Sequence, residues 1–204
     1  SQFQFVQNFA AAAATPAHWE TVRALRDGEA TLDGLDIDTD LSWQLLVSLA
    51  SGGAVTAEDM YAALAAGNTA KGGELAARAK AALPNAEAKR SAWASLIDTD
   101  EQPNTIVRAT AAGFTHPATV AQQREFVDAY FEMLLPVWEA RTYQIANYLI
   151  VGLYPAGMAD AVLRDATHAW LGANADAPAA LRRLVNENVA TVERALQVQQ
   201  QDKR

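Results

Sequence analysis

The stretch from residue 34 to residue 50 most constrains the fold, because it contains both a helix start and a helix body. Three leucines recur at every fourth position of its second half, namely Leu41, Leu45 and Leu49. One face of this helix can therefore be buried against neighbouring helices. Asp38, Thr39 and Asp40 precede that face and offer side-chain oxygens to the unpaired N–H groups of the first turn. The stretch predicts a capped, core-facing helix.

The same acidic residues have a second interpretation as metal ligands. Asp36, Asp38 and Asp40 alternate as in the opening of a calcium-binding EF-hand loop. Such a loop also requires glycine at its sixth place and glutamate at its twelfth. Leu41 and Val47 occupy those places here. We therefore favour helix capping over a calcium site.

Helical periodicity recurs along the whole chain, and no segment shows the sustained alternation of a strand. Helices are expected at 1–14, 15–26, 41–50, 57–66, 71–83, 87–97, 104–112, 119–151, 158–171 and 179–200. Pro136 divides the segment 119–151 into two helices or kinks a single one. The pattern predicts one all-α domain over 1–204, built of stacked antiparallel helix pairs in a HEAT/armadillo-like α-α superhelix, or solenoid.

Local signals mark where several of these helices begin and end. Capping residues are expected at Thr15 with Pro16, at Thr56, at Asp98 to Asp100, and at Thr119 with Gln122 three residues on. Gly67-Asn68 is expected to end the helix at 57–66.

Composition excludes several classes of function. A net charge of −8 argues against a nucleic-acid partner, since binding to phosphates depends on Lys and Arg. No apolar run approaches the roughly 20 residues that span a bilayer. The sequence has no cysteine, which excludes thiolate chemistry and fits a reducing cytoplasm. The chain begins at Ser1 without an initiator methionine, and we expect it to be a piece of a longer polypeptide.

Few residues are candidates for chemistry. His18, His116 and His168 are the histidines, and none lies in an H-E-x-x-H zinc motif, so we expect structural roles for them. The five tryptophans fall on expected helices, where core packing is the ordinary role: Trp19, Trp43, Trp93, Trp138 and Trp170.

Two charged pairs have open interpretations. Arg182-Arg183 lies on the last helix, where a solvated face is the default and contact with a carboxylate in a groove is the alternative. Glu139 and Arg141 lie in the most apolar part of the chain, either as a surface pair or as buried partners.

Several motifs together resemble a known family. The run Leu-Asp-Gly-Leu-Asp-Ile-Asp-Thr-Asp-Leu-Ser-Trp-Gln-Leu-Leu, at 32–46, resembles the C-terminal helical domain of bacterial zinc aminopeptidases of the aminopeptidase N family. Serine replaces the expected arginine at position 42, and Gly67-Asn68 replaces an expected Arg-Asp pair. Further similar segments are 88–93, 112–114, 138–141 and 181–187.

The resemblance implies a function without supplying a catalytic residue. The family releases N-terminal residues from peptides with a zinc ion, using H-E-x-x-H and Gly-x-Met-Glu-Asn motifs in upstream domains. Neither motif occurs in this sequence, so no catalytic, cofactor-binding or metal residue is carried over. The resemblance implies an N-terminally truncated part of the C-terminal domain, which closes over the active-site chamber and shapes peptide access. Its partners would be the upstream catalytic domain and the peptide substrate.

Two other classes of protein remain open. A free-standing helical-repeat adaptor would hold a peptide or protein on a concave face. A small enzyme with an unrecognised carboxylate site would need acids that converge in a pocket with shifted pKa values.

Overall fold

The computed structural model describes residues 2–66 and 70–202, and these residues form helices without any strand. The prediction of an all-α protein is confirmed. Gly67-Asn68, which was expected to end a helix, lies outside the described residues.

The first part of the described chain contains seven α-helices. They are α1 (Gln2–Ala11), α2 (Pro16–Arg26), α3 (Thr39–Ser51), α4 (Ala57–Ala66), α5 (Ala70–Ala82), α6 (Ala86–Ile97) and α7 (Asn104–Phe114). Thr15 caps α2 by accepting a hydrogen bond from the His18 N–H, with Pro16 in the first turn, as expected. Thr56 and Asp59 exchange hydrogen bonds between side chains and main-chain N–H groups at the start of α4, in the manner of a capping box.

The second part contains five α-helices and three short 3₁₀ turns. They are η1 (Pro117–Thr119), α8 (Val120–Gln123), η2 (Arg124–Phe126), α9 (Val127–Ala140), α10 (Tyr143–Gly152), η3 (Ala156–Met158), α11 (Ala161–Ala173) and α12 (Ala179–Gln201). The long last helix agrees closely with the expectation from apolar periodicity.

Two of the expected caps are wrong. Asp98 ends α6 as its C-cap, and α7 begins after Pro103 without a side-chain cap. Thr119 is buried and donates its hydroxyl hydrogen to the His116 carbonyl, so it does not cap α8. At Asp98 the main-chain N–H bonds back to the Ala94 carbonyl, and at Thr119 the side chain bonds back to the preceding turn.

Pro136 does not divide the apolar segment. It lies inside α9, and the break comes at Arg141 and Thr142, where the Thr142 side chain accepts a hydrogen bond from the Ile145 N–H and caps α10. The segment 119–151 thus contains α8, η2, α9 and α10, and none of the breaks between them falls at Pro136.

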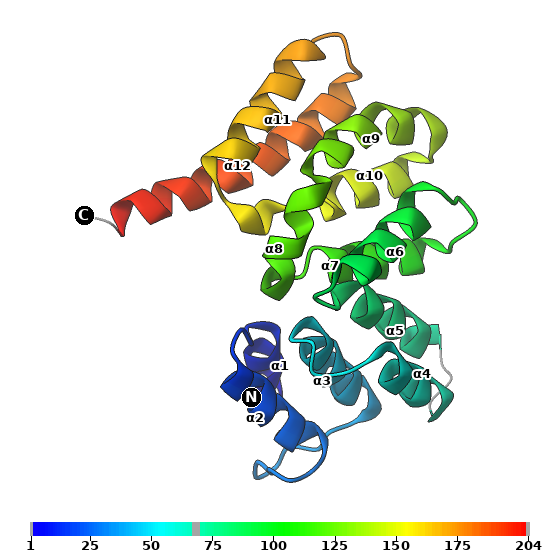
Figure 1. Ribbon diagram of the computed structural model, residues 1–204, viewed down its shortest axis with the longest axis vertical. Coiled ribbons are helices and arrows are strands. Elements are labelled where there is room, and N and C mark those ends of the chain that lie inside the picture. Colours follow the sequence, from blue (N-terminus) through cyan, green and yellow to red (C-terminus); the bar gives the residue numbers. More distant parts are fainter. Residues whose placement is uncertain (1, 67–69, 203–204) are drawn as a thin grey trace.

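The helices pack in two rows. In the first row α3, α5, α7, α10 and α12 contact one another in turn, and α4, α6, α9 and α11 pack against that row. Figure 1 shows the chain rising from α1 and α2 at one end to α11 and α12 at the other, with the C-terminal turns of α12 projecting beyond the body.

The buried apolar residues form two clusters that meet at α5. Ala76 and Ala79 belong to the cluster under α1 to α4, whereas Ala81 belongs to the cluster under α6 to α12. Helices α5 and α7 form the junction between them. A Cβ atom on Gly113 of α7 would lie 2.1 Å from the Arg78 carbonyl oxygen, so only glycine permits this close approach.

The start of α3 shows the expected capping. The Asp38 carboxylate accepts a hydrogen bond of 2.8 Å from the Leu41 N–H, and the helix behind it is almost completely buried. Asp36 lies in the loop before it and is exposed.

We predict that Asp38→Ala lowers the free energy of unfolding by about 0.5–2 kcal/mol, because it removes an N-cap acceptor. Asp36→Ala is the matched control and should leave stability within about 0.5 kcal/mol. Urea unfolding followed by circular dichroism measures both. Equal losses in the two variants would contradict the capping role, and a rise in melting temperature on addition of calcium would restore the metal interpretation.

We also predict that Gly113→Ala destabilises the protein by at least about 1–3 kcal/mol, because the added methyl group collides with main-chain atoms of α5. Gly172→Ala on α11 is the control, since a Cβ there meets nothing within 4 Å. That substitution should be neutral or stabilise the helix by up to about 1 kcal/mol. Similar melting temperatures for the two variants would argue against a tight α5–α7 contact.

Candidate functional site

The acidic residues before α3 do not converge. Asp38 caps the helix, Asp40 forms an ion pair with Lys71, and Asp36 is exposed. Across residues 2–66 and 70–202, no three His, Cys, Asp or Glu side chains lie together as metal ligands. The zinc implied by the resemblance needs such a set. The described residues therefore do not fit that ion, and we derive no chemistry through it.

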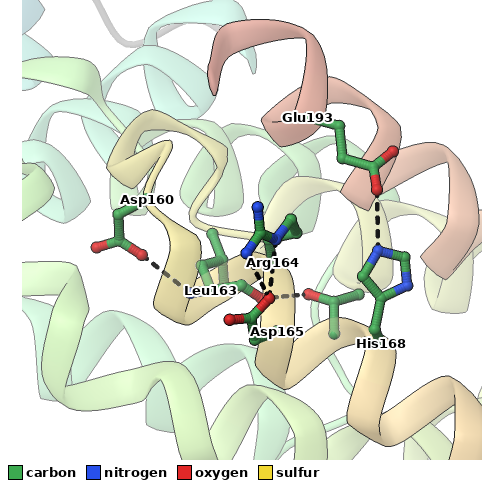
Figure 2. A network of polar contacts seen from close by, with 7 residues as sticks. Asp160, Leu163, Arg164, Asp165, His168 and Glu193 are labelled. Atoms are coloured by element: carbon green, nitrogen blue, oxygen red, sulfur yellow. Dashed lines mark hydrogen bonds and ion pairs between the residues drawn. The ribbon is translucent and has the colours of Figure 1, made fainter. Parts of the chain in front are cut away.

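The three histidines have separate local partners. The ring of His18 accepts a hydrogen bond from the Ala14 N–H at 3.2 Å. His116 is buried, and its Nδ1 accepts from the Ala118 N–H at 3.3 Å. Figure 2 shows His168 on α11 facing Glu193 on α12, at 2.9 Å, so this pair joins the last two helices.

The tryptophans pack as expected of core residues, although only one is fully covered. Trp43 on α3 is buried, and the other four keep part of their surface exposed. Trp93 on α6 packs against Phe114 and Phe126, with ring centroids 5.6 and 5.2 Å away.

The two uncertain charged pairs are resolved by their contacts. Arg182 donates hydrogen bonds to the Leu171 and Asn174 carbonyls at the end of α11, and Arg183 pairs with Glu187 on the surface. Arg141 donates to the main-chain carbonyls of Ile97 and Thr99 instead of pairing with Glu139, which is exposed. Each arginine with carbonyl partners fixes the end of a helix.

A buried lysine lies where the ends of α5 and α7 meet. Lys89 is fully buried, and its ammonium nitrogen lies 2.7 Å from the Ala81 carbonyl oxygen and 2.9 Å from that of Phe114. A longer contact of 3.5 Å reaches the Gly113 carbonyl. These carbonyls end α5 and α7, where the helix dipoles favour a donor. The signal for this role in the sequence is a lysine on the apolar face of an expected helix.

Burial changes the protonation of this region. It lowers the pKa of Lys89 to about 7. Burial, together with the positive charges of Arg78 and Lys89, lowers the pKa of His116 to about 4. A neutral lysine amine has two N–H donors, which match its two short carbonyl contacts. The junction therefore keeps its two main hydrogen bonds in either charge state of Lys89.

A broad groove lies between α4 and α6, over α5 and part of α7. Its volume is about 1120 Å³, and it is lined mainly by small and polar side chains. Alanines of α5 and α6 line it, namely Ala76, Ala77, Ala81, Ala88 and Ala92. Small residues bring the main chain close to anything that lies there. We call this hollow the α4–α6 groove.

Polar groups lie along this groove. Lys80 lies 3.6 Å from the ring centroid of Tyr61, and its hydrogen bond and charge lower the pKa of the tyrosine hydroxyl. Glu87 and Ser91 lie on the α6 side, one helical turn apart. Thr110 borders the groove from α7 and is buried. The groove thus offers donors, acceptors and an apolar surface together, which suits a peptide.

The fold defines an all-helical domain of two packed rows. A family model described as the ERAP1-like C-terminal domain matches residues 1–194. The chain is also 39% identical over 201 residues to an Aminopeptidase N of Streptomyces lividans, a match that covers 98% of this chain and 23% of that protein. The chain belongs to the ERAP1-like C-terminal domain family and corresponds to the C-terminal domain of an aminopeptidase N. The resemblance based on the motifs is confirmed.

This chain corresponds to only part of the related protein. It spans about a quarter of the length of the related aminopeptidase. No helix among the described residues is long and apolar enough to cross a membrane.

We predict that Lys89 makes stability depend on pH. The unfolded chain keeps the lysine proton up to about pH 10.5, whereas the folded protein releases it near pH 7. The unfolded state therefore binds more protons between these values, and the free energy of unfolding should rise with pH across this window, by up to about 1.4 kcal/mol per pH unit.

Lys89→Met retains most of the side-chain volume and removes the titrating group. The difference in unfolding free energy between the natural protein and this variant should grow in favour of the natural protein from pH 7.5 to pH 9.5. Urea unfolding at several pH values measures it. Parallel pH profiles for the two proteins would show that Lys89 does not titrate in this window.

Proposed function

We propose that this domain is the non-catalytic cover of a zinc-dependent aminopeptidase, which releases N-terminal amino acids from peptides. In this proposal the domain closes over the active-site chamber of the parent enzyme and limits which peptides enter. The observation that carries the proposal is the match to an aminopeptidase N over nearly the whole of this chain but only 23% of that protein. Zinc and the catalytic residues would belong to the remainder of the parent polypeptide.

The arrangement of helices supports a covering role. We propose that the two rows of helices form a HEAT/armadillo-like superhelix, in which each helix pair contacts mainly its neighbours. Such a fold presents extended surfaces, and the α4–α6 groove offers polar and apolar groups for a peptide. The upstream catalytic domain is the proposed partner.

The absence of cysteine from the sequence suits a reducing compartment, and we propose the cytoplasm as the site of action.

The test compares two substrates in the parent enzyme that carries this domain. Lys80→Glu and Glu87→Lys reverse single charges in the α4–α6 groove. Each should change kcat/KM for a longer peptide by about threefold or more, since a reversed charge in a partly enclosed groove alters ligand binding by at least about 0.7 kcal/mol. The value for a single-residue amide should stay nearly constant, because that substrate does not reach the groove.

Glu187→Lys is the control, since Glu187 lies on α12 and pairs with Arg183 away from the groove. It should leave both substrates unaffected. Equal losses on the peptide and on the amide in the groove variants would mean that the domain supports the catalytic domain structurally and does not select peptides.

A further inference from the structure

We propose that a second groove, between α6 and α9, binds a lysine or arginine side chain of a peptide. The groove has a volume of about 560 Å³, within the usual range of small-ligand sites. It is lined by α6, the loop that follows it, and α9. That the basic residue belongs to a peptide rests on the proposed function, whereas the preference for a cation rests on the groove itself.

The groove surface is partly apolar. Trp93 and Ile97 of α6 face Met133 and Val137 of α9 across it. Trp93 keeps part of its ring exposed while the rest packs against aromatic neighbours, so its position is fixed. A partly exposed tryptophan beside aliphatic groups favours the alkyl stem and the cationic head of a basic side chain.

The rim supplies hydrogen-bond acceptors. Asp98 and Asp100 border the groove from the loop, and Glu132 borders it from α9. Each carboxylate can only accept hydrogen bonds when ionised. All three are exposed, so each is free to reorient toward a ligand.

Arg141, the positively charged residue that lines this groove, already has hydrogen-bond partners. Arg141 donates hydrogen bonds to the Ile97 carbonyl at 3.0 Å and to the Thr99 carbonyl at 2.6 Å. Its guanidinium thus holds the end of α6 against the end of α9. The three carboxylates outnumber this single positive charge, so the groove is complementary to a positively charged, donor-rich group.

Binding of short synthetic peptides to the chain itself tests the inference. The probe is acetyl-Ala-Leu-Arg-Leu-Ala-amide, whose blocked ends leave the arginine as its only charge. The comparison peptide carries citrulline, which has nearly the same shape without the charge. Two-dimensional NMR follows the indole N–H signals at low ionic strength, with signals assigned by a Trp93→Phe variant.

We expect the arginine peptide to shift the Trp93 signal and to bind about tenfold or more tightly than the citrulline peptide, because charge-assisted hydrogen bonds are lost in the latter. Glu132→Gln should weaken the arginine peptide severalfold and leave the citrulline peptide unaffected. Glu187→Gln, on α12, is the matched control and should change neither.

Equal affinity for the two peptides, or no binding of either, would overturn the proposal. Binding that is insensitive to Glu132→Gln but shifts a different tryptophan would place the cation elsewhere and overturn it as well. The proposed function is tested separately, by the substrate comparison in the parent enzyme with variants of the α4–α6 groove. Either experiment can therefore fail without deciding the other.

Discussion

The structure depends on the convergence of two helix ends on a buried lysine nitrogen. Lys89 donates to the Ala81 and Phe114 carbonyls, which would otherwise be buried without partners at the ends of α5 and α7. An unpaired buried carbonyl costs about 1–3 kcal/mol, and Lys89 is the side chain among the described residues that donates to both of them. Gly113 allows the same two helices to approach until main chain contacts main chain. This contact lies at the C-terminal end of α5, the helix that contributes residues to both apolar clusters.

Much of the fold could be predicted from the sequence because the signals are local. The leucine spacing of α3, its Asp38 cap and the long apolar face of α12 are all determined within a few turns of helix. The expected caps at Thr119 and Asp98 are wrong. The Thr119 side chain bonds to the turn before it, and Asp98 ends the helix before it. Pro136 does not end a helix as expected, because packing around α9 tolerates a missing hydrogen bond that an isolated helix would not.

The candidate sites could not be predicted in the same way. Lys89 lies on the same face of α6 as the buried Ala92 and Leu96. A charge on such an apolar face is the one signal of its role that the sequence contains. The partners of that charge come from helices that end elsewhere in the chain. The α4–α6 and α6–α9 grooves likewise arise from the spacing of helices in one row, which no single segment encodes. Membership of the family was accessible because short motifs in a fixed order are a property of the sequence alone.

Helix α5 contributes side chains to both apolar clusters, and this has a consequence for how the domain loses its structure. Ala76 and Ala79 are needed on one side, and Ala81 on the other, within less than two turns. A cut in the loop after α5 would therefore leave the C-terminal piece without part of its core and without the carbonyl that Lys89 holds. Neither piece is a complete folding unit, so the domain should melt in one cooperative step and limited proteolysis should release no stable half.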